Sequence, residues 1–97
     1  MMMMTRRTVK RTSKFKKEYR KSQKQGKNMA LLNWVIDELA NDRSLPAKYH
    51  DHALKGDWKE HRECHISPDL LLIYRKESTG ELLLILVRLA SHSELDF

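Results

Sequence analysis

The order of apolar and polar residues at the start of the chain predicts a short strand followed by a helix. Residues 6–12 include the β-branched stretch TVKRT, which is typical of a strand. From 14 to 25, apolar residues recur at helical spacing among lysines and arginines. Ser13 is the expected N-cap, because its hydroxyl can accept from the free N–H groups of the first turn, and Gly26 is expected to end the helix.

A second helix is predicted directly afterwards, in the segment MALLNWVIDELAND at 29–42, with Asn28 as its cap. Its apolar positions fall at i, i+3, i+4 and i+7, and they form the stripe Leu32, Val35, Ile36 and Leu39. A stripe with this spacing faces a core. The short turn between the two helices predicts an αα-hairpin.

The second half of the chain predicts a long loop and then three strands. Residues 43–58 have no periodicity, and a loop of this length is often functional. Strands are expected at 58–66, 69–76 and 80–90, with a hairpin turn at Gly80 between the last two. The order β-α-α-β-β-β predicts an α+β fold in which the two N-terminal helices pack on an antiparallel sheet.

The first of these strands has two chemically different faces, because successive side chains of a strand point to opposite sides. Cys64 and Ile66 share one face and are expected to meet the helices. His61, Glu63 and His65 share the other face, which is expected to be open. Two imidazoles and a carboxylate on an open face suggest chemistry.

Composition limits the class of protein. With 97 residues, 40% of them hydrophobic and 33% charged, the chain is expected to form one domain over 1–97. We interpret residues 1–5 as an artefactual or disordered start. The longest apolar run, LLLILV, is far below the roughly 20 residues that span a bilayer, so no membrane contact is expected. The lone Cys64 cannot form an internal disulfide, which fits the cytoplasm.

Positive charge is concentrated at the N-terminal end. Residues 1–27 hold eleven lysines and arginines against the single acid Glu18, a net charge of +10, whereas the remaining seventy residues carry −4. Such a distribution is typical of nucleic-acid binding, and the alternative is a solvated helix face. The candidate RNA-binding cations on the helix are Lys14, Lys16, Lys17, Arg20, Lys21 and Lys24.

All five histidines follow residue 49. A metal site is one explanation, but the chain has no Cys-x-x-Cys or His-Glu-x-x-His spacing, and Cys64 and His65 are adjacent residues that point to opposite faces of a strand. We therefore predict neither a metal nor another cofactor. Acid–base chemistry is the second explanation, because imidazole exchanges protons near neutral pH.

Cleavage of RNA through its own 2′-hydroxyl needs a base, a cation for the phosphorane charge, and an acid for the leaving 5′-oxygen. Histidine, aspartate and arginine side chains supply these roles without a metal. The placement of the histidines favours such a role for His52, His65 and His92, whereas His50 and His61 are expected to be surface or capping residues.

Three segments resemble the YafQ-type toxins of the RelE/ParE superfamily: TSKFKKEYRK, LPAKYHDHALKGDWKEHRECHISPDLLLIYR and LVRLASHSEL. The resemblance runs from about residue 8 to the end of the chain. It implies the βααβββ RelE-like fold and a bacterial type II toxin, a ribosome-dependent mRNA endonuclease. It also implies two partners, mRNA on the ribosome and a cognate antitoxin that neutralises the toxin.

The resemblance also implies an active site without a metal. The motif D-H-x-L-x-G contributes His52, H-x-x-P-D contributes His65 and Asp69, and R-x-x-x-H contributes Arg88 and His92. Many members end in H-x-x-L-F with a functional aromatic residue. This chain ends in HSELDF, so Asp96 takes that position and Phe97, displaced by one, is the residue expected to stack on a base.

Two alternatives remain open. A ParE-like toxin would inhibit gyrase and would not be a nuclease, and ParE-like members generally lack this set of histidines. A non-catalytic nucleic-acid-binding module would use the histidines for structure only. RNA cleavage on translating ribosomes would separate these alternatives from an endonuclease.

Overall fold

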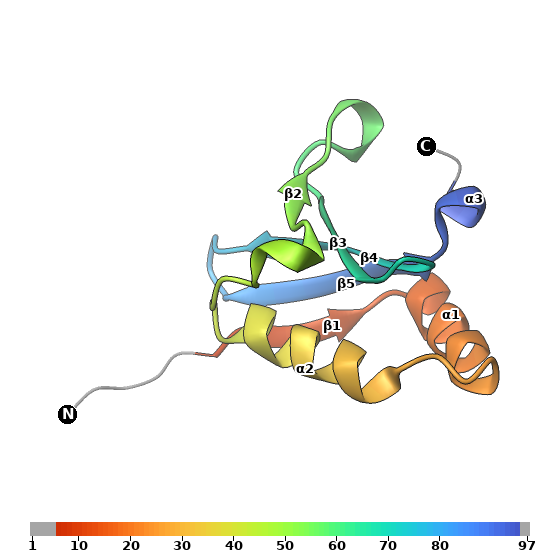
Figure 1. Ribbon diagram of the computed structural model, residues 1–97. Helices are drawn as coiled ribbons and strands as arrows, with labels where there is room; N and C mark the ends of the chain where they lie inside the picture. Colours follow the sequence, from red (N-terminus) through yellow and green to blue (C-terminus); the bar gives the residue numbers. More distant parts are fainter. Residues whose placement is uncertain (1–5, 96–97) are drawn as a thin grey trace.

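The computed structural model describes residues 6–95 and shows a five-stranded sheet with the helices α1 (Ser13–Lys24) and α2 (Met29–Ala40) on one face (Figure 1). Along the chain the elements are β1 (Thr8–Arg11), α1 (Ser13–Lys24), α2 (Met29–Ala40), the 3₁₀ turn η1 (Ala47–Tyr49), β2 (His52–Ala53), the 3₁₀ turn η2 (Gly56–Trp58), β3 (Arg62–Ser67), β4 (Leu70–Glu77), β5 (Leu83–Ala90) and α3 (His92–Leu95). The predicted α+β fold and the order of its main elements are confirmed.

The sheet is mixed, which differs from the predicted antiparallel arrangement. The strand order is β1-β5-β4-β3-β2, and every neighbouring pair is antiparallel except β1 and β5, which run parallel. Strands joined by a short hairpin must be antiparallel. The strands β1 and β5 are separated by most of the chain, so no turn constrains their relative direction.

Both helices begin at side-chain caps. The N-cap of α1 is Thr12 and not the predicted Ser13: the hydroxyl of Thr12 accepts from the Phe15 N–H at 3.0 Å and donates to the Val87 carbonyl at 2.8 Å. Thr12 therefore ties the start of α1 to β5. Asn28 caps α2 as predicted, accepting from the Leu31 N–H at 3.0 Å.

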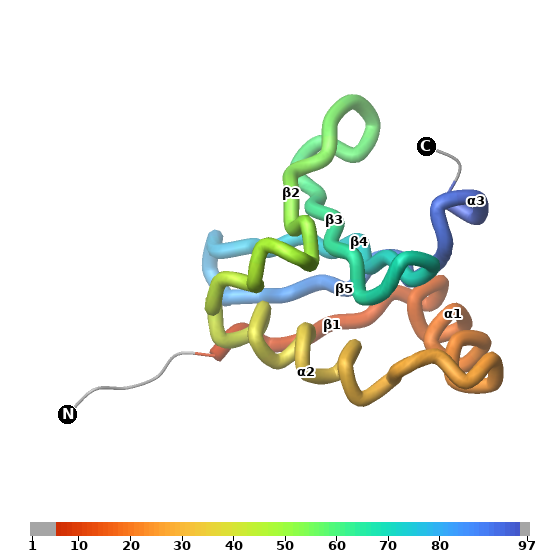
Figure 2. Tube along the Cα trace, viewed as in Figure 1, coloured from red at the N-terminus to blue at the C-terminus, as the bar shows by residue number. Residues whose placement is uncertain are grey.

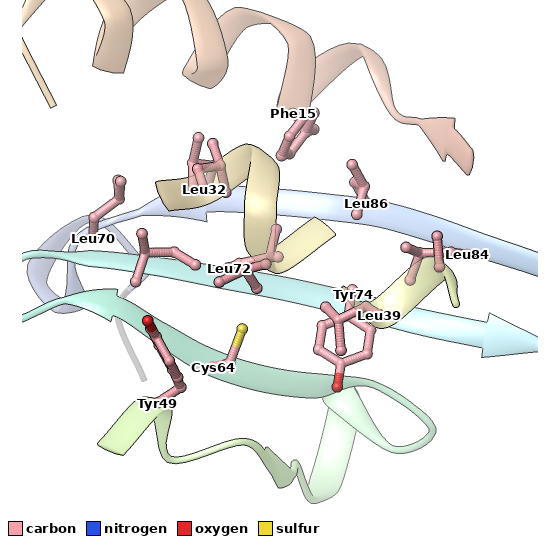
Figure 3. Close-up of a cluster of buried hydrophobic side chains, with 14 residues drawn as sticks. Phe15, Leu32, Leu39, Tyr49, Cys64, Leu70, Leu72, Tyr74, Leu84 and Leu86 are labelled. Atoms are coloured by element: carbon pink, nitrogen blue, oxygen red, sulfur yellow. The ribbon is translucent and has the colours of Figure 1, made fainter. Parts of the chain in front are cut away.

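The main core lies between the helices and one face of the sheet (Figure 3). The predicted stripe of α2 faces it, with Leu32, Val35 and Leu39 buried and Ile36 packed at its edge. The face of β3 that holds Cys64 is buried here as predicted. The central strands supply the rest of this layer through Leu70, Leu72, Tyr74, Leu84, Leu86 and Leu89.

A smaller apolar cluster lies on the opposite face and includes Leu71, Ile73, Ala90 and Leu95. Two segments cover it: the stretch from β2 to η2, and the C-terminal turn α3. Both project to the same side of the sheet, away from α2 (Figure 2). Neither β2 nor α3 was predicted, because two residues of strand and four of helix leave no periodicity in a sequence.

The predicted strand at 58–66 begins only at Arg62. Its first residues are taken up by η2 and by a turn in which Glu60 has a positive φ of 75°. Within residues 6–95, no helix is long and apolar enough to cross a membrane.

Candidate active site

Strand pairing brings two of the predicted site residues together. His52 on β2 lies directly opposite Glu63 on β3, and His65 is two residues further along the same strand. Residues opposite each other in an antiparallel pair point to the same side of the sheet, as do residues i and i+2 of one strand. The three side chains therefore share the face opposite the main core, and the ring centroids of His52 and His65 are 6.3 Å apart. The prediction that this face is open is wrong at Glu63, which is 3% exposed where β2 pairs with β3.

His92 joins this group from the residues that follow β5. His65 is paired with Leu71 on β4, and Leu71 is paired with Ala90 on β5, so the three residues form one row across the sheet. His92 follows two residues after Ala90, where α3 begins. Its ring centroid is 5.5 Å from that of His65. His65 is thus the centre of the cluster, and the sites predicted at His52, His65 and His92 meet.

Glu63 was expected on the same face as His65 but was not among the predicted site residues. It is 3% exposed, yet one of its carboxylate oxygens, Oε2, has no hydrogen-bond partner within residues 6–95. The other, Oε1, lies 3.3 Å from Nε2 of His65 and 3.7 Å from Nε2 of His52. Buried carboxylates are normally paired, so an incompletely satisfied one between two imidazoles marks a functional site.

A metal ion could also use this arrangement. Ligand atoms of Glu63, His65 and His92 lie within 4.8 Å of one another. Two imidazole nitrogens and a carboxylate oxygen are donors that zinc and copper accept. The spacing rules that argued against a metal apply to local motifs, whereas these three residues come from two distant segments.

His50 also contacts the cluster, with its ring centroid 5.4 Å from that of His65. His52 Nδ1 lies 2.6 Å from the His50 carbonyl oxygen, and because a carbonyl only accepts, Nδ1 donates in this bond. Asp51 anchors the loop between them by accepting from the Tyr74 hydroxyl at 2.6 Å and from Arg62 Nε at 3.2 Å.

His61 lies outside the cluster. Its ring packs edge-on against Trp58 with centroids 5.2 Å apart, which agrees with the structural role expected for it.

Arg88 lies on β5 beyond the residues that pair with β1, and Glu18 of α1 holds it there. Its Nε and Nη2 donate to the two carboxylate oxygens at 3.0 and 2.9 Å, and the Leu89 N–H donates to the same carboxylate at 3.0 Å. The bond to Glu18 raises the pKa of Arg88 against the opposing effect of burial. Because one edge of the guanidinium is bound, the Nη1 edge is left for another oxyanion.

Asp69 is not among the residues that contact the histidines. It follows β3 in an exposed turn, where Lys27 and the Ser67 hydroxyl donate to its two oxygens, the latter at 2.9 Å. Both bonds lower the pKa of Asp69, and the bond from Lys27 has the larger effect.

A groove of about 690 Å³ lies between α1, the start of β4 and the C-terminal end of β5, and none of the histidines lines it. Arg88 and Asp69 both line it, together with Lys14, Lys17 and Lys21 of the basic helix. The six predicted RNA-binding cations of α1 are all exposed. Phe97 lies outside the described residues.

The Glu18–Arg88 pair allows a prediction about stability. Their side chains are 12% and 20% exposed, so Glu18→Ala would leave both the guanidinium and the Leu89 N–H without their acceptor. We expect the free energy of unfolding to fall by about 1–3 kcal/mol in urea denaturation. Lys21→Ala is the control, because Lys21 and Glu94 form an exposed pair on the same surface and its loss should change little. Equal destabilisation by both substitutions would contradict this account.

The thiol is excluded from the chemistry. Cys64 is fully buried in the main core, and burial raises the pKa of its thiol far above the usual range. A thiol of this kind is neither a nucleophile nor a metal ligand at neutral pH.

Comparisons with known proteins agree over almost the whole chain. Residues 7–96 match the family model described as a bacterial toxin of type II toxin–antitoxin systems, YafQ. The mRNA interferase toxin YafQ of Escherichia coli K12 is 37% identical over 73 residues, which cover 74% of this chain and 79% of the relative.

Solved structures with the same fold include one toxin with a bound metal and one toxin in complex with an antitoxin. A metal-bound toxin from Helicobacter pylori is 46% identical, with a TM-score of 0.84 over 91% of this chain and 97% of that one. The chain matched in the E. coli DinJ–YafQ toxin–antitoxin complex is 35% identical to this one. Its TM-score is 0.81, and the match covers 93% of this chain and 97% of that one. Given the match of sequence and fold, the chain belongs to the YafQ family of bacterial type II toxins.

Proposed function

We propose that this YafQ-family toxin is an endoribonuclease that cleaves mRNA on the ribosome by metal-free acid–base chemistry. The observation that carries the proposal is the cluster in which the rings of His52 and His92 both contact that of His65. A groove lined by lysines and Arg88 also includes Ser91 and Ser93, the chain neighbours of His92. The E. coli K12 relative of this chain is an mRNA interferase, which is the same class of activity.

The proposed reaction uses the RNA as its own nucleophile. One imidazole removes the proton of a ribose 2′-hydroxyl, and the 2′-oxygen forms a bond to the adjacent phosphorus. The bond from phosphorus to the 5′-oxygen breaks, and a second imidazole protonates that oxygen. The products are a 2′,3′-cyclic phosphate and a 5′-hydroxyl, so the protein only takes up one proton and gives another, and no water is consumed in this step.

Arg88 is assigned to the charge that develops on the phosphorane oxygens, because its guanidinium is fixed by Glu18 and retains a free edge. Asp69, the carboxylate at the turn after β3, is kept among the proposed catalytic residues. Its partners in the structure are Lys27 and Ser67. Contact with a histidine would require Asp69 to exchange one of these partners when RNA binds.

The proposed partners are mRNA on the ribosome, bound through the cations of α1, and a cognate antitoxin. The DinJ–YafQ complex supports the second, since it shows that a YafQ toxin with this fold binds an antitoxin. Action on ribosomes places the toxin in the cytoplasm.

Expression of the wild-type protein alone is expected to arrest bacterial growth, because cleavage of mRNA stops translation. Co-expression of the cognate antitoxin should restore growth. The measurement is the growth curve after induction, with folding checked on the purified protein. Normal growth with folded wild-type protein would contradict both the nuclease and the gyrase inhibitor, and would favour a non-catalytic binding module.

Metal binding is a second candidate activity of the same residues, because a homologous H. pylori toxin is metal-bound and the ligand atoms of Glu63, His65 and His92 lie close together. The unpartnered Oε2 of Glu63 fits such a role. A bound ion would supply a fixed positive charge. It would also occupy the imidazole nitrogens that the proposed proton transfers need, so it should inhibit the nuclease.

We therefore expect Zn²⁺ to inhibit cleavage and a chelator that spares the ribosome to preserve it. Glu63→Gln should weaken zinc binding at least about tenfold in calorimetric titration, since even residues behind the ligands contribute that much. His61→Ala, outside the cluster, is the matched control and should bind zinc like the wild type. Loss of cleavage in the chelator, restored by zinc, would overturn metal-free catalysis.

A further inference from the structure

A hollow of about 430 Å³ lies on the other side of the β3–β4 turn from the cationic groove. Its walls come from the first turn of α2, from η1 and from the end of β3. Leu31, Ile66 and Pro68 give it apolar surface, together with the edge of the buried Tyr49. The acid–base cluster accounts for the histidines but leaves this hollow without a role.

The hollow and the cluster share a wall. His65, the central imidazole of the cluster, also lines the hollow, and so does His50, whose ring centroid is 5.4 Å away. An occupant of the hollow would therefore touch the residue that contacts both His52 and His92. The position of the hollow links it to the reaction.

The lining identifies the chemical class of the occupant. The apolar side chains of the lining suit the faces of a planar ring, and the polar groups of Lys48, His50 and Ser67 can bond to the edges of that ring. The volume is within the range of small-molecule sites, about 300–1,000 Å³. Aromatic and apolar side chains that stack, with a few polar groups at the edge, are how proteins hold an unstacked RNA base.

We propose that this hollow binds the base of the nucleotide on the 5′ side of the scissile phosphate. That nucleotide provides the attacking 2′-hydroxyl, and a single ribose separates its base from this hydroxyl and from its 3′-phosphate. A base held in the hollow can thus present its sugar to His65, which lines it. The proposal rests on the proposed nuclease function and adds the subsite that positions the nucleophile and reads the base.

The direct test is NMR titration of the full chain with nucleoside 3′-monophosphates. These probes carry the base, the ribose and the 3′-phosphate, but they lack a leaving 5′-oxygen and so cannot be cleaved. Ribose 5-phosphate, which has no base, is the control ligand. We expect the methyl signals of Leu31 and Ile66 to shift with the nucleotides and to stay in place with ribose 5-phosphate. Shifts confined to α1, or equal shifts with both ligands, would overturn the base site.

A pair of variants on α2 tests the same site by substitution. Leu31→Trp fills the hollow, and Ala30→Trp places the same bulk at an exposed neighbouring position outside it. Leu31→Trp should weaken nucleotide binding at least about fivefold, the lower end of what a stacked base contributes. It should also change the base found 5′ of the cut in mRNA. Ala30→Trp should change neither. Equal effects of the two variants would contradict the assignment.

The two proposals can fail separately. If mRNA is cleaved on ribosomes but no nucleotide shifts the Leu31 and Ile66 signals, the base site is wrong and the nuclease stands. If nucleotides bind in the hollow but mRNA is not cleaved, the nuclease is wrong and the base site is left as a binding site.

Discussion

Replacing His92 by alanine is expected to lower the rate of mRNA cleavage on translating ribosomes by about 10²–10⁴, the usual cost of losing a proton-transfer group. His92 is exposed at the start of α3 and its ring contacts His65, so it can approach a phosphate without the cost of burial. The measurement is single-turnover cleavage of a defined mRNA, with circular dichroism to show that the variant is folded.

His61→Ala is the matched control for this substitution. His61 is a histidine of the same half of the chain, but it packs against Trp58 outside the cluster, so its loss should leave the cleavage rate nearly unchanged. Antitoxin binding by the His92 variant should persist, because an exposed side chain contributes little to the core. If the His61 and His92 variants lose activity to the same extent, the assignment of His92 is wrong.

Neutralising Lys14, Lys17 and Lys24 together is expected to weaken binding to ribosomes and to flatten its dependence on salt. Each phosphate contact that is lost should reduce the slope of log K against log salt by about 0.7–0.9. All three lysines are exposed on α1, and Lys14 and Lys17 line the groove that also holds Arg88. Binding is measured by co-sedimentation at several salt concentrations.

The control removes the same charge elsewhere. Lys10, Lys55 and Lys59 are also exposed but do not line the groove. Replacing these three lysines by glutamine should reduce the slope of log K against log salt only by the small amount that the lower net charge causes. An unchanged slope in the α1 variant would make the basic helix a solvated face.

Elements with a clear period could be predicted from the sequence. The stripe of α2 and the core-facing side of β3 follow from the spacing of apolar residues, and both are confirmed. The N-cap of α1 was misplaced by one residue because Thr12 and Ser13 are adjacent hydroxyl residues with the same local chemistry. Thr12 has the additional bond to the Val87 carbonyl, a contact between residues 75 positions apart that no local pattern contains.

The site was predictable where placement along the chain or a family motif singles out the residue. His52, His65 and His92 were favoured on both grounds, and the structure brings them together. Glu63 was noted on the same face as His65, but its burial and its closeness to His52 depend on the pairing of β2 with β3. Glu18 was recognised only as the single acid of a basic segment. Its role at Arg88 depends on how α1 lies against β5.

The most direct test of the central claim is cleavage of an mRNA that carries one 2′-deoxynucleotide on the 5′ side of a mapped cut. The experiment uses the wild-type toxin, purified translating ribosomes, and a chelator that leaves the ribosomes intact. The account predicts that the all-ribose mRNA is cut to leave a 2′,3′-cyclic phosphate and a 5′-hydroxyl, and that the deoxy substitution abolishes that cut. Cleavage of the deoxy-substituted mRNA at the same position, or products with a 5′-phosphate, would contradict it.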